Sequence, residues 1–174
     1  MASQYLLCAF GPDRTGLVEE LSECILKGRF NILDSRMTIL GDHFSMLLLV
    51  AGNPSGVAGL QEAAGKIRNL TVQFKDVQTR PFSTDRFEYA VRIMGNDTPG
   101  LVHAVTGYLK ARDANVASME TWMTHAPHSG TEIFNMNIVT EVSRNVSFRE
   151  FKDGLIRLCD TLNLEAEIEP YTRG

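Results

Sequence analysis

The sequence contains the segment Phe-Gly-Pro-Asp-Arg-Thr-Gly-Leu-Val at residues 10–18 and the segment Met-Gly-Asn-Asp-Thr-Pro-Gly-Leu-Val at residues 94–102. The two segments lie 84 residues apart, and five of their nine positions are identical. At the same spacing, Asn31-Ile32 matches Asn115-Val116. This period is far longer than that of solenoid repeats, which is about 20 to 50 residues. The repeat therefore predicts two domains of similar fold.

The match between the two copies continues at a larger spacing. Phe44-Ser45-Met46 corresponds to Phe134-Asn135-Met136 at an offset of 90, so the second copy has room for a longer hairpin loop around residues 125–130. Pro81 lies in a polar stretch between the copies, where it interrupts any regular element. We therefore expect a first domain at residues 1–79, a connector at residues 80–86 and a second domain at residues 87–174.

Each copy has the pattern of a strand, a helix, two strands, a helix and a strand. In the first copy, Leu17, Leu21 and Ile25 recur at helical spacing. Gly41-Asp42 is a tight turn between two apolar stretches, and residues 70–74 alternate as a last strand. The order βαββαβ is that of ferredoxin-like domains, in which two helices cover one face of a four-stranded antiparallel sheet. The predicted fold class is therefore α+β, with two such domains in tandem.

Several residues are expected to begin or end the helices. Ser147 and Glu150 have the spacing of a capping box. Ser55 is expected to cap the second helix of the first copy, and Thr98 the first helix of the second copy. Gly28 suits the left-handed position that often follows a helix.

The stretch at residues 44–50 is apolar on both of its faces. Leu47 and Leu49 alternate there with Met46 and Leu48. Only one face of the sheet can be covered by the helices, so we expect the other face to pack against the other copy or another subunit.

Composition limits the possible functions. The net charge is -4 and the Lys and Arg residues are scattered, so direct nucleic-acid binding is not expected. The apolar runs are too short to span a membrane, and no basic stretch precedes the first of them as in a secretory signal. Cys8, Cys24 and Cys159 are odd in number and far apart, which favours reduced thiols in a cytoplasmic protein. Because no Cys-x-x-Cys spacing occurs, a zinc site is not expected. No other metal and no cofactor is predicted.

The loop after the first strand of each copy is the candidate site. In the first copy, Gly11 is expected to allow a sharp exit from the strand, and Gly16 to let a ligand approach the backbone closely. The free N–H groups at a helix N-terminus attract a carboxylate, while Asp13 could accept hydrogen bonds from an ammonium group and Asn31 offers a donor and an acceptor. Free amino acids carry both charged groups, although the same residues would also serve a turn and a helix cap alone. The corresponding residues of the second copy are Gly95, Asp97, Gly100 and Asn115.

These residues resemble those of ACT domains, a family of amino-acid-binding regulatory modules. In the first copy the likeness rests on Phe10-Gly11, Asp13-Arg14, Gly16-Leu17-Val18, Asn31-Ile32, Asp34-Ser35-Arg36, Leu40-Gly41 and Phe44. In the second copy it rests on Asn96-Asp97-Thr98-Pro99-Gly100-Leu101 and Asn115-Val116. Thr15 stands where ACT loops often have proline, which is a mild exchange because proline is favoured there rather than required.

The resemblance implies an amino acid bound at an interface between modules, near the first loop and the start of the second strand. The ligand-binding residues that it implies are Gly11, Asp13, Arg14, Gly16, Leu17, Asn31, Ile32, Asp97, Gly100, Leu101 and Asn115. Within the family, the likeness is to transcriptional repressors of glycine cleavage. It implies a homo-oligomeric regulator with glycine as the favoured ligand and a DNA-binding activator protein as partner. No substrate domain follows the second copy, which favours regulators over the folate deformylases that begin with a similar module.

Other functions are alternatives at this point. An acyl-phosphate hydrolase on the same fold needs an Arg in the first loop, which Arg14 offers, but the second copy has Thr98 there. An RNA-recognition domain needs exposed aromatics and a basic residue on its third strand, whereas residues 44–50 contain one aromatic and no Lys or Arg. A constitutive protein–protein adaptor without a ligand has the same sequence signature as a sensor. Trp122 is expected to anchor an interface or a core rather than to stack on a base. No enzymatic activity is expected.

Overall fold

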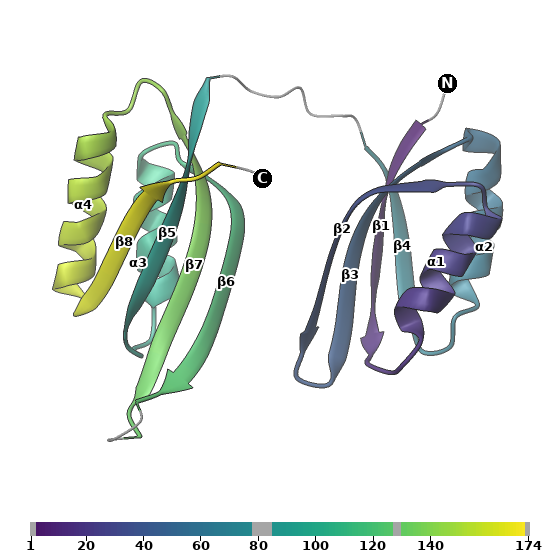
Figure 1. Cartoon of the computed structure of the whole chain (residues 1–174), viewed down its shortest axis with the longest axis horizontal. Coiled ribbons are helices and arrows are strands. Elements are labelled where there is room, and N and C mark those ends of the chain that lie inside the picture. The colour runs from purple at the N-terminus through teal and green to yellow at the C-terminus, as the bar shows by residue number, and fades with distance from the viewer. Residues whose placement is uncertain (1–2, 78–84, 127–129, 173–174) are drawn as a thin grey trace. The chain divides into compact units, whose positions relative to one another are not determined.

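The computed structural model describes residues 3–77, 85–126 and 130–172. The chain divides into two compact units, Met1–Pro81 and Phe82–Gly174 (Figure 1). Most of the connector expected at residues 80–86 lies outside the described residues, and Arg86 is already the first residue of a strand. The predicted loop at residues 125–130 is likewise described only in part, because residues 127–129 fall outside these ranges.

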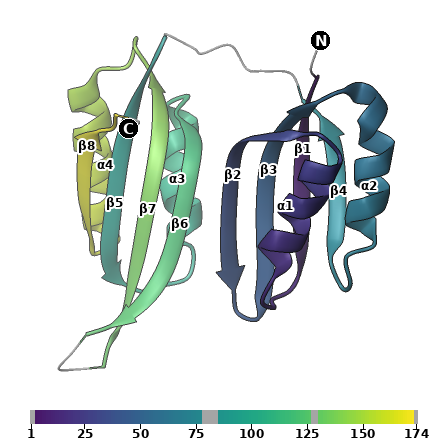
Figure 2. The same ribbon diagram turned by 45° about the vertical axis from the view of Figure 1, so that its right-hand side comes forward.

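The first unit is a four-stranded antiparallel sheet with two helices on one face (Figures 1 and 2). Its strands follow the order β2-β3-β1-β4 across the sheet. The elements are β1 (Ser3–Pro12), α1 (Leu17–Lys27), β2 (Asn31–Leu40), β3 (His43–Gly52), the 3-10 turn η1 (Pro54–Gly56), α2 (Val57–Gly65) and β4 (Thr71–Asp76).

The second unit repeats this architecture with the strand order β6-β7-β5-β8. Its elements are β5 (Arg86–Asn96), α3 (Leu101–Ala111), β6 (Asn115–His125), β7 (Glu132–Ser143), α4 (Phe148–Thr161) and β8 (Leu164–Pro170). The predicted α+β class with two ferredoxin-like βαββαβ units is therefore confirmed. No helix among the described residues is long and apolar enough to cross a membrane.

The strand register confirms the alignment of the two copies. Gly11 of β1 pairs with Phe44 of β3, and Gly95 of β5 pairs with Phe134 of β7. The offset thus changes from 84 to 90 between the first and third strands of each copy. The difference arises in the hairpin loop, because β2 and β3 are joined by two residues whereas β6 ends at His125 and β7 begins at Glu132.

A β-bulge occurs at the same place in each copy. The register shifts between Ile32 and Asp34 in the first unit and between Val116 and Ser118 in the second. A bulge bends the strand and re-aims the side chains that follow it. The sequence pattern did not indicate either bulge.

Each unit has its own hydrophobic core between the sheet and the helices. Strands β1 and β3 bury every second residue, as expected for a sheet with one covered face. The largest fully buried side chains of the first unit include Leu7, Leu21, Ile25, Phe44 and Leu48. Those of the second unit include Leu109, Met136, Ile138, Phe151 and Leu155.

The edge strand β2 lies outside the cover of the helices. All ten of its residues are exposed, although half of them are apolar. Met37 and Ile39 pair with buried residues of β3 and so point to the helix side of the sheet, but they remain 49% and 47% exposed. An exposed apolar edge strand is a place where another strand can pair.

Two of the predicted helix caps differ from the structure, and one is confirmed. Helix α3 begins at Leu101 after Gly100, so Thr98 is not its cap. Asn53 rather than Ser55 begins the second helical segment of the first unit, because its Oδ1 accepts the Ser55 N–H at 3.1 Å. Ser147 is the N-cap of α4 as predicted, and its Oγ accepts the Glu150 N–H.

The end of α1 also differs from the prediction. Gly28 is in the right-handed region, and Arg29 takes the left-handed conformation with φ of 58°. A Cβ at Gly28 would make close contacts of about 3.3 Å with the Phe30 ring and the Cys24 carbonyl. The backbone turn was thus predicted one residue too early.

Candidate functional site

Both copies begin their first helix in the same unusual way. Gly16 precedes α1 with φ of 94°, and Gly100 precedes α3 with φ of 97°. Neither glycine supplies a side-chain acceptor to the helix. The first-turn N–H groups and the positive end of the helix dipole are therefore left for another anion. Leu17 and Leu101 follow these glycines, and both side chains are buried in the core, so they can offer a ligand little more than their backbone.

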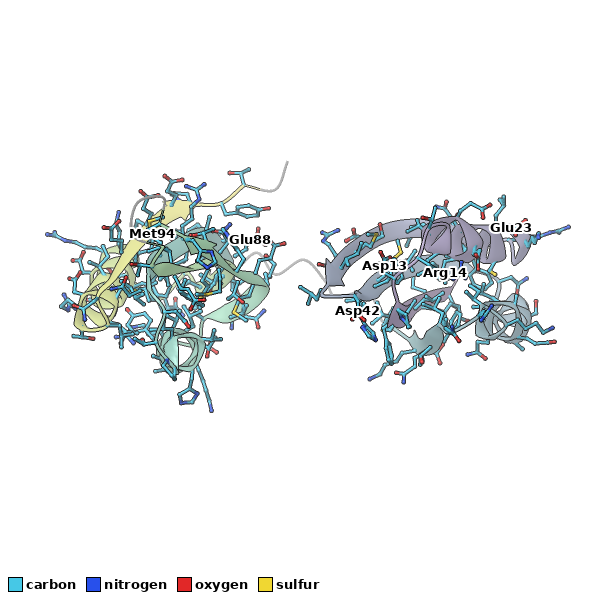
Figure 3. The ribbon with its side chains drawn as sticks, turned by 90° about the horizontal axis from the view of Figure 1, so that it is seen from below. Asp13, Arg14, Glu23, Asp42, Glu88 and Met94 are labelled. Atoms are coloured by element: carbon cyan, nitrogen blue, oxygen red, sulfur yellow. The ribbon has the colours of Figure 1, made fainter. Side chains whose placement is uncertain are left out.

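In the first unit, the loop before α1 is held by its own side chains and backbone. The Asp13 N–H donates to the Asp42 carbonyl at 2.8 Å, which ties the loop to the β2–β3 hairpin. Asp13, Arg14 and Asp42 are labelled in Figure 3, which views this unit from below. Arg14 donates from Nη1 and Nη2 to the two carboxylate oxygens of Glu20 at 2.5 and 2.7 Å. This hydrogen bonding lowers the pKa of Glu20 and raises that of Arg14.

The corresponding loop of the second unit is built differently. It has Thr98 and Ala104 where the first unit has Arg14 and Glu20, so the bidentate ion pair cannot form. Instead, an open cavity of about 560 Å³ lies over the start of α3. Its lining includes Asp97, Thr98, Gly100, His103, Thr106 and Phe134.

This cavity combines the groups that an amino acid needs. Its volume is within the usual range for small-molecule sites, which is roughly 300 to 1,000 Å³. The helix N-terminus at Gly100 attracts a carboxylate, and the Asp97 carboxylate in the same lining can accept hydrogen bonds from an ammonium group. Phe134, a buried residue of the core, also belongs to the lining.

Gly11 and Gly95 have a packing role that the sequence did not indicate. Strand β1 continues through Gly11 to Pro12, so the sharp exit expected at Gly11 does not occur there. A Cβ on Gly11 would lie 2.3 Å from the Asn69 carbonyl oxygen, and a Cβ on Gly95 would lie 2.8 Å from that of Asn163. These glycines let the loop before the last strand of each unit approach the first strand.

Asn31 lies far from the loop of its own unit. It pairs with Ala51, which pairs in turn with Gln4 at the start of β1. The loop with Asp13 follows Pro12, at the other end of β1. Pro12 lies eight residue steps along the strand from Gln4, which corresponds to about 26 Å. The structure therefore does not bring Asp13 and Asn31 together within one unit.

Two more of the predicted ligand-binding residues are Ile32, which follows Asn31, and Asn115, which is the counterpart of Asn31 in the second unit. Ile32 pairs with Val50 and so lies on the helix side of β2, where it is 39% exposed. Asn115 begins β6 and donates from Nδ2 to the Glu141 carboxylate at 3.0 Å. It is separated from Asp97 in the same way, because β6 also runs parallel to the first strand of its unit.

Three residues that adjoin these loops, in α1, α3 and β7, were missed from the sequence. Glu20 pairs with Arg14, and His103 and Phe134 line the cavity of the second unit. The position of His103, three residues after Gly100, is a signal that could have indicated it, because the first helical turn surrounds the N-terminal N–H groups. Phe134 could be found only through the register of β5 with β7. Among the residues that the structure describes, no group of three His, Cys, Asp or Glu side chains could hold a metal ion.

Known proteins with sequences similar to this chain were found by comparison. Residues 3–75 match the family model of the ACT domain. The chain is 22% identical over 173 residues to the glycine cleavage system transcriptional repressor of Escherichia coli (strain K12), covering 97% of this chain and 91% of that protein. The same values hold for the protein of that name from Shigella flexneri.

The whole architecture also occurs in a solved structure. A protein of unknown function from Galdieria sulphuraria matches 99% of this chain and 100% of its own, with a TM-score of 0.84 and 24% identity. This likeness extends over both units and concerns the fold. The match of residues 3–75 shows an ACT domain in the first unit, and the second unit has the same fold.

Proposed function

We propose that this protein is a cytoplasmic regulatory protein that binds a free amino acid at the loop before the first helix of its units and passes its state to a partner protein. The observation that carries this proposal is the cavity of the second unit, where Asp97 lies beside an uncapped helix N-terminus. The two groups match the ammonium and carboxylate of an amino acid. A small ligand such as glycine is favoured by the distant likeness to the glycine cleavage repressor.

The contacts of Arg14 favour regulation over hydrolysis. A phosphate-binding loop would need a free cationic side chain, but both terminal nitrogens of Arg14 donate to Glu20. The second unit has no cation at this position, because Thr98 stands there. We therefore propose that neither loop performs acyl-phosphate hydrolysis.

The position of Asn31 supports a ligand site completed by a second module. The end of β2 lies at the same end of the sheet as the Asp13 loop, since Leu40 pairs with His43 and His43 pairs with Pro12. If β2 pairs antiparallel with β2 of a second copy of the chain, the partner's strand begins where the first one ends. The Asn31 side chain of that copy then lies near the Asp13 loop, which accounts for the separation found within one unit.

The distant likeness to the glycine cleavage repressor also supports transcriptional regulation through a protein partner. The curated relatives are named transcriptional repressors. A chain with a net charge of -4 is poorly suited to contact DNA over its surface. We propose that the partner is a DNA-binding activator protein, which would supply the DNA contact.

The test is thermal unfolding of the full chain against a panel of free amino acids that includes glycine and serine. A ligand present at about 100 times its dissociation constant stabilises the folded state by about 2.7 kcal/mol. For a chain of this size, that energy corresponds to a Tm increase of roughly 5–10 °C. The substitution Asp97→Asn is expected to remove most of this increase, because it removes the charge opposite the ammonium group.

The matched control is Asp160→Asn, which removes an exposed carboxylate from α4 that is not among the residues lining the cavity. It is expected to leave the Tm increase unchanged. If none of the amino acids raises the Tm, the sensing function is wrong, and the protein is a constitutive protein–protein adaptor.

A further inference from the structure

The charge of this protein is distributed unequally between its two units. Residues 1–81 contain eight Lys or Arg and eight Asp or Glu, so the first unit is neutral. Residues 82–174 contain nine Lys or Arg and thirteen Asp or Glu. The whole net charge of -4 therefore resides in the second unit.

Much of the acidic excess lies on one surface, which we call the open face. It is the face of the β6-β7-β5-β8 sheet opposite α3 and α4, and the strand register identifies its residues because directly paired residues share a face. It carries two arginines, Arg86 and Arg92, and six glutamates. These glutamates are Glu88, Glu120, Glu141, Glu165, Glu167 and Glu169.

An apolar row crosses the open face near one end. Trp122 of β6 pairs with Asn135 of β7, which pairs with Met94 of β5, and Met94 pairs with Glu165 of β8. Met94 and Glu88, which belongs to the same face, are labelled in Figure 3. Trp122 and Met94 are 43% and 48% exposed.

Asn135 holds the middle of this row in place. It is buried, and its Nδ2 donates to Thr124 Oγ1 at 3.0 Å and to the Ile133 carbonyl at 3.1 Å. A buried, hydrogen-bonded amide between two exposed apolar side chains fixes their spacing. Tryptophan and methionine are both enriched at protein interfaces, and tryptophan is among the residues that contribute most to binding energy.

Glutamates lie at one end of the apolar row and in the row beside it, whereas the row on its other side consists of Thr124, Ile133 and Asn96. Glu120 and Glu167 lie at the two ends of the next row, in which Arg92 is the cation. The Arg92 guanidinium lies 3.7 Å from Glu167 and 3.8 Å from Glu169, so its charge is already balanced by two carboxylates. The surface therefore has exposed apolar side chains near one end and an excess of carboxylates beside them. Its complement has apolar side chains next to a cluster of Lys and Arg.

We propose that the open face of the second unit is the docking surface for a basic protein surface, of the kind that DNA-binding proteins present to nucleic acid. This inference rests on the proposed regulatory function, in which the partner is a DNA-binding protein. Docking here covers the cationic residues with which such a partner holds phosphate groups. A regulator without a basic patch can in this way weaken DNA binding by competition.

The sequence contains one tryptophan, so Trp122 reports on this surface alone. The experiment titrates the full chain with a synthetic peptide of about 20 residues that is rich in Lys and Arg and has Leu at its centre, and records the emission of Trp122. We expect the emission to shift to shorter wavelength, with an affinity that falls as salt is added. A version of the peptide with Glu in place of every Lys and Arg is expected to give no shift.

Two charge variants locate the binding surface. The variant E120Q/E165Q removes carboxylates from both sides of the open face and is expected to weaken binding about three- to tenfold. The control E19Q/D160N removes the same charge from α1 and α4 and is expected to leave the affinity unchanged. Equal weakening by both variants overturns the proposal, as does peptide binding that leaves Trp122 emission unchanged or the absence of binding.

A second copy of the chain is the competing occupant of the open face. Sedimentation velocity and Trp122 emission, measured together over a range of protein concentrations, reveal a dimer that buries the open face, and this result also overturns the proposal. Failure of the sensing function is distinguishable, because it removes the amino-acid-dependent Tm increase and leaves peptide binding intact.

Discussion

At the scale of single residues, Gly100 and Gly107, before and within α3, differ in whether the position requires glycine. Gly100 has φ of 97° and no atom within 4 Å of an added Cβ, so its conformation alone requires glycine. Gly107 lies in the exposed interior of α3 and also has open space around an added Cβ. Steric conflict is therefore absent at both positions, and they differ only in backbone conformation.

Opposite changes in stability are expected from alanine at these two glycines. Gly100→Ala should lower the free energy of unfolding by about 1–2 kcal/mol, because a side chain is strained in the left-handed region. Gly107→Ala should raise it by up to about 1 kcal/mol through helix propensity. Denaturant titration measures both values. Equal effects of the two substitutions would show that the conformation of Gly100 is not what makes glycine necessary.

The residues show why the site was predicted only in part. The sequence predicted the loops, their glycines and their aspartates, because these features are local. It could not indicate that Gly11 is needed for the approach of the Asn69 carbonyl, since Asn69 is 58 residues away along the chain. The ion pair of Arg14 with Glu20 was also missed, because their spacing of six places them on the loop and the helix rather than on one helix face.

At the scale of elements, β2 differs from an ordinary surface strand. Its exposed apolar side chains and its single neighbour in the sheet suit it to pair with another strand. Strand β4 is the other edge of the same sheet and has only six residues. The two edges thus provide a test and a control within one unit.

The substitution Met37→Lys is expected to prevent the proposed pairing of β2 with β2 of a second copy, because a charged side chain on the edge opposes strand pairing. Met37 is half exposed, so the unfolding free energy should change by less than about 1 kcal/mol. Gln73→Lys on β4 should leave the oligomer intact. Sedimentation velocity compares the variants, and an unchanged oligomer in Met37→Lys rules out β2 as the assembly edge.

The order of the elements could be predicted from periodicity. That order by itself already determines that Asn31 and the Asp13 loop lie far apart within one unit. A strand that follows a helical crossover runs parallel to the strand before it, so β2 begins where β1 begins. This rule already separates Asn31 from the Asp13 loop. The local pattern treated them as neighbours, because it considered the spacing along the chain rather than the direction of the strands.

At the scale of the whole molecule, the two units have separate hydrophobic cores. The substitution Leu7→Ala removes a fully buried side chain from the first core and should cost about 2–5 kcal/mol. Hydrogen exchange is expected to show faster exchange of β1 and β3 amides, with the amides of β5 and β7 unchanged. Loss of protection in both units would mean that they unfold as one cooperative body.

The uncovered strand β2 also has a consequence for synthesis of the protein. The first unit leaves the ribosome before the second unit has been translated. At roughly 5–20 residues per second, the second unit takes about 5–20 s to complete. During this time the folded nascent unit carries an exposed strand of ten residues with Ile32, Leu33, Met37, Ile39 and Leu40 uncovered. On a polysome, such strands from neighbouring chains can pair before assembly is complete, so expression at high rate is expected to favour aggregation through this strand.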